Sequence, residues 1–328
     1  MPPKVSVCIT NYNYGKYLGQ CLTYLLAQDF KDFEAIVIDN CSTDDSEEIA
    51  RRFEKADKRV RFVKNERNLG MNGNRNRAFE LAEGNIIYML SPDDFVINGI
   101  LEEISGAFDK NPDVNMVFLN LVTFFDDSKT IKKNIYGKRL SFPMERKLAY
   151  FEIAGDILAG RLDKTIMVGS FAIRNVRGLK SRFGVDDPGG EALFLLRYLI
   201  ETRGLSLYLD RDLFFFRAHG ANMGYRVNME KNFRYYSEEL RKLLTENARD
   251  KRLMDSLLGS RYYSLGSFVI YLIYSPDMSL RARGLSMMIE TAKFHFRLRD
   301  LFFYPYDFLK RVVASKVRSL LLKTYGIV

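Results

Sequence analysis

The sequence predicts an α/β fold in which helices flank a mostly parallel sheet, followed by a helical region at the C-terminal end. Three observations support this prediction. Short apolar runs alternate with helix-like runs over the first hundred residues. Two of the apolar runs lead into aspartates, and open α/β sheets bind their ligands just beyond such strand ends. Beyond residue 231 the chain becomes basic and rich in aromatic residues.

The strands expected in the first half are short runs rich in β-branched and aromatic residues, at residues 5–10, 34–39, 60–63 and 85–90. A helix is expected at residues 18–28, where apolar side chains fall on one face. Further helices are expected at residues 47–56, after several cap-forming residues, and at residues 73–82. This alternation predicts parallel strands joined by right-handed crossovers.

Later elements are fewer and less regular. We expect a helix at residues 98–108, a long apolar strand at 114–125 and a strand at 165–173. The basic segment 126–146 is expected to be a loop on the acceptor side. The chain is expected to be helical from about residue 232, so the predicted domains are residues 1–230 and 231–328.

Composition indicates an ordinary globular protein, with 328 residues, 47% hydrophobic and 28% charged. The three cysteines lack Cys-x-x-Cys spacing, so we expect reduced residues of a cytoplasmic protein. The first residues lead directly into a strand, and we expect no signal peptide. No run reaches 18 apolar residues, so no membrane-spanning helix is expected.

Positive charge gathers at the C-terminal end. The net charge is +9, and residues 251–328 hold 13 Lys and Arg against 5 Asp and Glu. Basic and aromatic side chains on one helix fit a peripheral contact with a membrane surface. A helical subdomain that packs on the first domain, or a homo-oligomer interface, fits equally well. Nucleic acid is not an expected partner, because no recognisable binding motif accompanies the charge.

Asp93 and Asp94 follow the expected strand 85–90, after Ser91 and Pro92. Adjacent carboxylates repel each other, and a hard cation such as Mg²⁺ or Mn²⁺ would relieve that repulsion while binding phosphate oxygens. Alternatively, Asp94 caps a helix or lies in a solvated turn. The chain has neither Gly-x-Gly-x-x-Gly after its first strand nor Gly-Lys-Ser/Thr, so a nucleotide would have to be held by loop residues and a metal.

Several motifs occur in an order that resembles family 2 glycosyltransferases. They are Thr10-Asn11-Tyr12-Asn13, the run from Ile36 through Asp39 to Asp44, Asn68-Leu69-Gly70 with Arg75-Asn76, Gly84, and Leu90-Ser91-Pro92-Asp93-Asp94. Members of that family are inverting, metal-dependent enzymes with the GT-A fold. The resemblance covers residues 4–125 strongly and continues more faintly to about residue 225.

The resemblance implies a donor site. Residues 10–13 would line the base pocket, with Tyr12 against uracil. Asp39 would hydrogen-bond the base, and Arg75 would approach the ribose or diphosphate. Each residue also has a purely structural interpretation: Tyr12 as a packed aromatic side chain, Asp39 as a helix cap and Arg75 as a solvated helix charge.

The resemblance also implies a metal site. Asp93 would ligate a Mg²⁺ or Mn²⁺ ion on the donor diphosphate, with Asp94 beside it. His219 matches a family histidine near the diphosphate and metal. The family commonly carries aspartate where this chain has Ser91. A hydroxyl can contact a ribose, but it does not ligate a metal as a carboxylate does.

Glu191 matches the position of the family's general base, because Arg197 follows it at the expected separation of six residues. Asp186 and Asp187 remain alternatives for that role. The sequence therefore suggests an inverting hexosyl- or N-acetylhexosaminyl-transferase, which uses a nucleotide-sugar donor such as a UDP-sugar. A glycan or lipid-linked glycan at the cytoplasmic face of a membrane is the expected acceptor. The alternative is a catalytically weakened nucleotide-sugar-binding module whose basic tail docks to a membrane or partner protein.

Overall fold

The computed structural model describes residues 2–134, 147–153, 167–184 and 191–220, together with residues 242, 246, 247, 249, 250, 252 and 253. All of them belong to one structural unit, Met1–Ile157 with Arg161–Leu257. The helical region expected from residue 232 lies almost wholly outside the described residues, as do residues 185–190.

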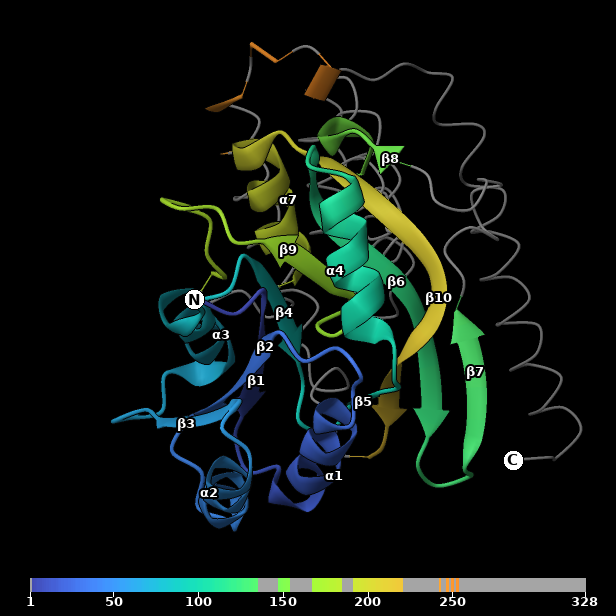
Figure 1. Ribbon diagram of the computed structural model, residues 1–328. Coiled ribbons are helices and arrows are strands. Elements are labelled where there is room, and N and C mark those ends of the chain that lie inside the picture. Colours follow the sequence, from blue (N-terminus) through green and yellow to red (C-terminus); the bar gives the residue numbers. More distant parts are fainter. Residues whose placement is uncertain are drawn as a thin grey trace, which may run out of the picture. The chain divides into compact units, whose positions relative to one another are not determined.

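Four parallel strands form the N-terminal half of the sheet (Figure 1). They are β1 (Val5–Asn11), β2 (Phe33–Asp39), β3 (Val60–Lys64) and β4 (Ile86–Leu90), in the spatial order β3-β2-β1-β4. The predicted parallel pairing is confirmed for these strands. Because parallel strands end at the same edge, the loops that follow β1, β2 and β4 lie at a common side of the sheet.

The second half of the sheet pairs in both directions. Its strands are β5 (Phe95–Val96), β6 (Val114–Phe125), β7 (Thr130–Asn134), β8 (Lys147–Leu148), β9 (Phe171–Arg174) and β10 (Leu205–Ala218). The order continues β4-β9-β6-β10-β5, with β7 beside β6 and β8 beside β10. β6 and β10 are parallel, whereas β9 runs antiparallel to both β4 and β6. β6 has the bounds that the sequence predicts.

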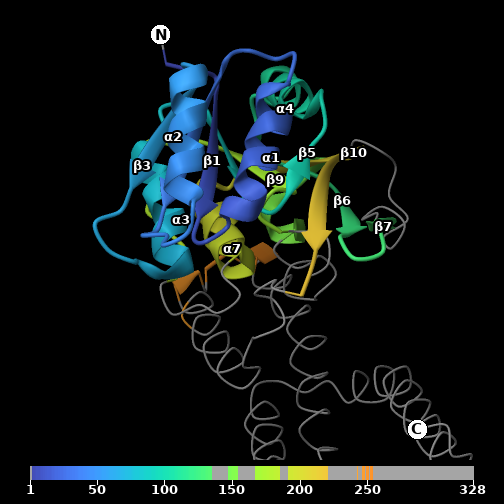
Figure 2. The same ribbon diagram turned by 90° about the horizontal axis from the view of Figure 1, so that it is seen from below.

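Helices cover both faces of the sheet (Figure 2). One apolar core joins the sheet to α1 (Gly15–Leu26), α2 (Ser46–Ala56) and α4 (Ile100–Lys110). A second core, on the opposite face, joins it to α3 (Gly70–Leu81) and α7 (Glu191–Thr202). The central strand β4 is buried along its whole length, as its apolar composition predicts.

α1 and α3 start three residues earlier than expected, and α4 starts two residues later. α1 begins at Gly15 because the side chain of Asp44, from the loop after β2, accepts a hydrogen bond from the Gly15 backbone N–H at 2.8 Å. α4 begins only after Gly99, whose φ of 98° is left-handed and stops the helix from extending to residue 98. Helical periodicity reveals neither the Asp44 contact nor the Gly99 conformation.

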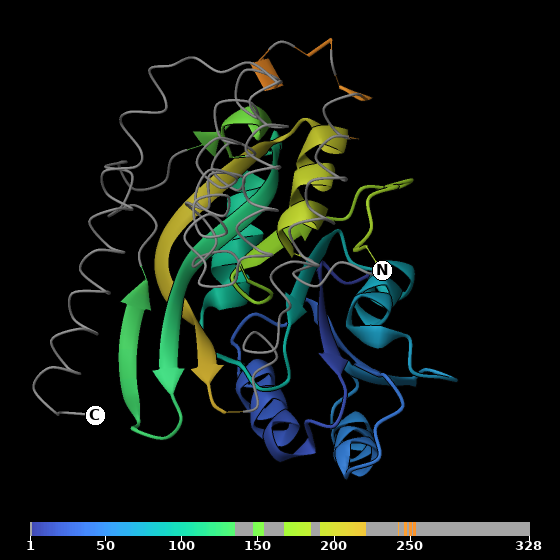
Figure 3. The ribbon, with the colours of Figure 1, turned by 180° about the vertical axis from the view of Figure 1, so that it is seen from behind.

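The expected loop at residues 126–146 is partly wrong. Thr130–Asn134 forms the edge strand β7, which pairs antiparallel with β6 (Figure 3), and residues 135–146 lie outside the described residues. Lysines in this segment masked its strand character, and lysine is a common residue on sheet edges. The strand expected at 165–173 is shorter, Phe171–Arg174, because Met167 to Ser170 form a turn around Gly169. None of the helices formed by described residues combines the length and hydropathy that crossing a bilayer requires.

Candidate active site

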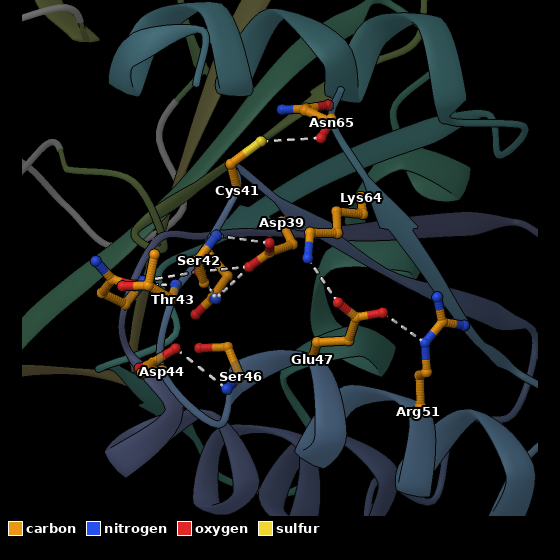
Figure 4. Close-up of polar contacts among 12 residues, drawn as sticks. Asp39, Cys41, Ser42, Thr43, Asp44, Ser46, Glu47, Arg51, Lys64 and Asn65 are labelled. Atoms are coloured by element: carbon orange, nitrogen blue, oxygen red, sulfur yellow. Dashed lines mark hydrogen bonds and ion pairs between the residues drawn. The ribbon is translucent and has the colours of Figure 1, made fainter. Parts of the chain in front are cut away.

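A buried aspartate ties together the loops that follow β1 and β2 (Figure 4). Asp39 is fully buried, and its carboxylate accepts three hydrogen bonds. The donors are Asn11 Nδ2 at 2.9 Å, the Ser42 backbone N–H at 2.9 Å and the Ser42 hydroxyl at 2.5 Å. Asn11 and Asp39 meet because the parallel register pairs them directly. Asp39 therefore holds the shape of both loops.

The loop after β1 presents an aromatic side chain outward. Tyr12 is 44% exposed, while Thr10 before it is partly buried. Asn13 is left-handed, with φ 57°, which asparagine tolerates better than most residues. Its backbone N–H donates to Ser42 Oγ at 2.9 Å, and its side-chain oxygen accepts from the Thr43 N–H at 2.7 Å. This turn leaves the Tyr12 ring accessible at the surface.

Buried asparagines brace the same edge of the sheet. Asn65, after β3, donates from Nδ2 to Asn40 Oδ1 at 3.1 Å and to Asn74 Oδ1 at 2.8 Å. Asn74, on α3, donates to the backbone carbonyl of Ile38 at 3.0 Å. Such a connected amide network fixes backbone positions that apolar packing alone would leave less specific. Sequence reasoning missed these residues, because isolated asparagines resemble loop residues.

The carboxyl end of β4 carries the predicted acidic pair against β10. His219 Nε2 lies 3.1 Å from Asp93 Oδ2, although the two residues are 126 positions apart. The Arg217 backbone N–H donates to Asp94 Oδ1 at 2.9 Å, and Arg217 Nε donates to the Asp93 carbonyl at 2.8 Å. All four residues are buried. The tertiary structure thus brings together Asp93 and His219, the two residues expected at a metal.

Burial disfavours charge on both carboxylates. Desolvation raises the pKa of Asp93, and the hydrogen bond from His219 opposes that rise. The pKa of Asp94 lies well above its usual value, because burial is complete and the neighbouring Asp93 carboxylate adds repulsion. The backbone N–H and guanidinium of Arg217 offset only part of this cost. A cation beside the pair would stabilise both ionised carboxylates.

Two tyrosine rings at the start of α1, Tyr14 just before the helix and Tyr17 within it, contact the histidine. His219 stacks on Tyr17 at a centroid distance of 4.9 Å and meets the edge of Tyr14 at 6.2 Å. The Arg217 guanidinium also lies over Tyr17, at 5.2 Å. Sequence reasoning gave no role to Tyr14 or Tyr17, and the tyrosines at the start of α1 were the available signal. Arg217 and His219 together match the Arg-x-His sequence that the family resemblance places near the diphosphate and metal.

The donor atoms present fit a divalent cation that is shared with a ligand. Asp93 supplies a carboxylate oxygen and His219 an imidazole nitrogen, both suitable for Mn²⁺, while Mg²⁺ prefers the oxygen. Among the described residues, no group of three or more His, Cys, Asp or Glu gathers that could hold a metal by itself. Phosphate oxygens and water would therefore complete the coordination, and the half-buried Ser91 lies beside this site in sequence.

A second constellation joins α3 to α7. Arg75 Nη2 forms an ion pair with Glu191 Oε1 at 2.8 Å, with the two side chains 8% and 20% exposed. Arg75 is therefore not the solvated helix charge that was one alternative. Arg197 lies further along α7. Asp186 and Asp187, the alternative bases, lie outside the described residues.

Comparisons with known proteins identify the family of this chain. The family model described as "Glycosyl transferase family 2" matches residues 6–179. An uncharacterized glycosyltransferase of Methanocaldococcus jannaschii is 35% identical over 152 residues, which are 46% of this chain and 52% of that protein. A Campylobacter jejuni protein named GalNAc(5)-diNAcBac-PP-undecaprenol β-1,3-glucosyltransferase is 33% identical over 103 residues, which are 31% of this chain and 33% of that protein. The chain thus spans about half or less of these relatives.

A solved structure shows the same fold. Residues 1–349 of Staphylococcus aureus TarS, in complex with UDP-GlcNAc, superpose with a TM-score of 0.66 at 18% identity, covering 88% of this chain and 81% of that one. At that identity the likeness concerns the GT-A-type fold alone. The family model, in contrast, matches more than half of the sequence, including both aspartates that follow β4. This chain belongs to glycosyl transferase family 2.

Proposed function

We propose that this protein is an inverting glycosyltransferase that moves a sugar from a UDP-sugar to a glycan or lipid-linked glycan. The observation that carries the proposal is the buried Asp93–Asp94 pair at the carboxyl end of β4, with His219 3.1 Å from Asp93. Two buried carboxylates are costly unless a cationic partner is part of their function. Donor diphosphate with a divalent cation is a partner of the right charge.

In this proposal the exposed Tyr12 ring stacks on uracil. Asp39 and Asn11 fix the loops that form the base pocket, through the hydrogen bonds described above. Asp93 and His219 would hold a divalent cation, which would neutralise charge on the leaving diphosphate. Arg217 orients this turn, because it donates to the Asp93 carbonyl and to the Asp94 side chain. Ser91 contributes a hydroxyl to the ribose.

Glu191 is the proposed general base. Its carboxylate takes the proton of the acceptor hydroxyl while that oxygen bonds to the anomeric carbon and the bond to the diphosphate breaks. Attack from the face opposite the leaving group inverts the anomeric centre in one displacement. Glu191 begins α7, and a helix N-terminus favours a negative side chain.

The proposed acceptor class rests on two observations. The Campylobacter relative is named for an undecaprenol-linked acceptor, and the C-terminal quarter of this chain carries most of its positive charge. A cytoplasmic protein docked at the inner membrane face would meet such acceptors. The shape of the pocket decides whether the transferred sugar is a hexose or an N-acetylhexosamine. The UDP-GlcNAc complex of TarS makes UDP-N-acetylglucosamine the first donor to test.

The test is binding and turnover with defined nucleotides. We expect UDP with Mn²⁺ to raise the melting temperature of the full chain. At a ligand concentration of 100 times Kd, the free energy of unfolding should rise by about 2.7 kcal/mol. EDTA should abolish the effect. Asp93→Asn should remove the Mn²⁺-dependent part, whereas Asp127→Asn, at an exposed hairpin position, should leave it intact. Metal-dependent release of UDP from a panel of UDP-sugars then identifies the donor.

The second candidate is a nucleotide-sugar-binding module of weakened catalysis, whose basic tail docks to a membrane or partner protein. Ser91 favours it, because a hydroxyl does not ligate a metal as the family's carboxylate does, and no group of three or more His, Cys, Asp or Glu among the described residues could hold a metal. UDP binding without any UDP release across the donor panel would support this candidate. Absence of both binding and release would contradict the two proposals together.

A further inference from the structure

The ion pair between Arg75 and Glu191 links two parts of the chain that are 116 positions apart. Arg75 lies on α3, within the nucleotide-binding half expected from sequence, and Glu191 is the first residue of α7. The Nη2–Oε1 distance is 2.8 Å. The Arg75 side chain is 8% exposed, so its charge is largely desolvated.

Neighbouring side chains of α3 bind the backbone of Phe183 and Gly184, the last described residues before α7. Asn72 Nδ2 donates to the carbonyl of Gly184 at 2.7 Å. Asn76 exchanges two hydrogen bonds with the backbone of Phe183, both at 2.9 Å. Asn72 lies three residues before Arg75 and four before Asn76, so it shares a helix face with each of them. α3 thus contacts both the backbone at Phe183 and Gly184 and the Glu191 side chain.

Aromatic packing reinforces this connection. The Phe183 ring lies under the Arg75 guanidinium at 5.4 Å and stacks on Phe194 of α7 at 4.2 Å. The guanidinium therefore lies between a ring and a carboxylate, with Asn72 Oδ1 accepting from Nη1 at 3.3 Å. These contacts limit the orientation of the Arg75 guanidinium. The ion pair in turn limits the orientation of the Glu191 carboxylate.

A glutamate side chain has three rotatable bonds, so a base of this type needs an external contact to stay aimed at its substrate. Among the described residues, the Arg75 contact engages Oε1 of Glu191. The second carboxylate oxygen can then take the acceptor proton without losing the ion pair. Removing Arg75 would leave a half-buried carboxylate without its positive partner, and the carboxylate would turn toward water.

We propose that Arg75 is a positioning residue for the base Glu191, and that it acts on proton transfer rather than on donor binding. This inference rests on the proposed function. It differs from the resemblance-based expectation that Arg75 approaches the ribose or diphosphate. The acceptor proton moves to Glu191, the new glycosidic bond forms, and UDP leaves with the electrons of the broken bond; Arg75 exchanges no proton.

The experiment compares full-length Arg75→Met, Arg75→Lys and Glu191→Gln with the control Arg77→Met. Arg77 lies on the same helix, its side chain is 36% exposed, and it pairs with Glu80 one turn away. The probes are UDP with Mn²⁺ for calorimetric affinity, and UDP-GlcNAc and UDP-glucose for UDP release with water as acceptor. Melting temperatures monitor folding.

We expect Arg75→Met to lower kcat by roughly 10- to 100-fold, while the Kd for UDP changes less than twofold. Arg75→Lys should recover part of kcat, because it restores the charge but not the planar fork. The double variant Arg75→Met/Glu191→Gln should be no slower than Glu191→Gln alone, since Arg75 acts through Glu191. Arg77→Met should match wild type.

A large loss of UDP affinity in Arg75→Met, with Glu191→Gln unaffected, would instead make Arg75 a donor contact. Multiplying effects in the double variant would also overturn the inference. If Arg75→Met unfolds, Arg75→Lys carries the same comparison, and wild-type kcat in that variant would contradict positioning by the fork. A wild-type protein that neither binds UDP nor releases it would defeat the proposed function itself.

Discussion

Two adjacent carboxylates at the end of β4 lie in almost complete burial. Asp94 is 2% exposed and Asp93 7%, and a polar side chain so placed normally needs a compensating charge. Arg217 compensates in part, through its backbone N–H to Asp94 and its guanidinium to the Asp93 carbonyl. At the scale of single residues, the buried carboxylates lower the stability of the metal-free protein at the place where the proposed cation and diphosphate bind.

That cost predicts a stabilising substitution. Asp94→Asn should raise metal-free stability at pH 8 by roughly 1 kcal/mol, since Asn Oδ1 still accepts from the Arg217 N–H and no charge is buried. The Asp94 pKa is raised in the folded state, so wild type loses stability as pH rises from about 4 through that raised pKa. The advantage of asparagine should therefore shrink as pH falls toward 4.

Thermal melts of both proteins between pH 4 and 8, in EDTA, measure this difference. Asp127→Asn, an exposed hairpin position, is the matched control and should change little at any pH. An Asp94→Asn protein that is less stable than wild type at pH 8 would show that Arg217 fully compensates the buried charge.

At the scale of secondary-structure elements, short turns decide how strands reach the site. Gly169 precedes β9 with φ 98°, and an added Cβ would lie 2.1 Å from the Phe214 ring of β10. Its carbonyl accepts the buried Tyr88 hydroxyl of β4 at 2.6 Å. The turn therefore couples three strands in which side chains and backbone leave no spare volume.

Gly169→Ala should destabilise the protein by about 2 kcal/mol or more, because it adds both left-handed strain and a steric clash. Gly106→Ala is the matched control: Gly106 lies inside α4, and its Cβ would meet nothing within 4 Å. That substitution should be neutral or stabilise by up to about 1 kcal/mol. Urea unfolding distinguishes them, and equal midpoints would contradict the packing described at Gly169.

At the scale of the whole molecule, the sheet unites a parallel half, whose strand β4 leads into Asp93, with a mixed half, whose strand β10 leads into His219. Glu191 begins the helix α7 and pairs with Arg75 of α3. The proposed reaction needs all of these elements, because the donor-binding residues and the base come from different ones. Charge is also divided along the chain, with most of the +9 carried by its last quarter. That quarter is the proposed contact with an anionic membrane surface.

The full-length protein should co-float with vesicles containing about one-third phosphatidylglycerol at low ionic strength, and leave them in 1 M salt, where the Debye length falls to about 3 Å. Vesicles of phosphatidylcholine alone should bind much less. Flotation assays with both compositions provide the measurement. Equal binding to the two, or salt-resistant binding, would contradict an electrostatic contact and favour packing of this region against protein.

The sequence by itself determined the alternation of strands and helices and the parallel first half, because hydrophobic periodicity is local. It also placed Asp93 and Asp94 at a strand end, since Pro92 and the apolar run before it are neighbours in the chain. Only the tertiary structure decided that His219 meets Asp93 and that Arg75 meets Glu191. Contacts across more than a hundred residues depend on strand order and crossover geometry, which no local pattern encodes.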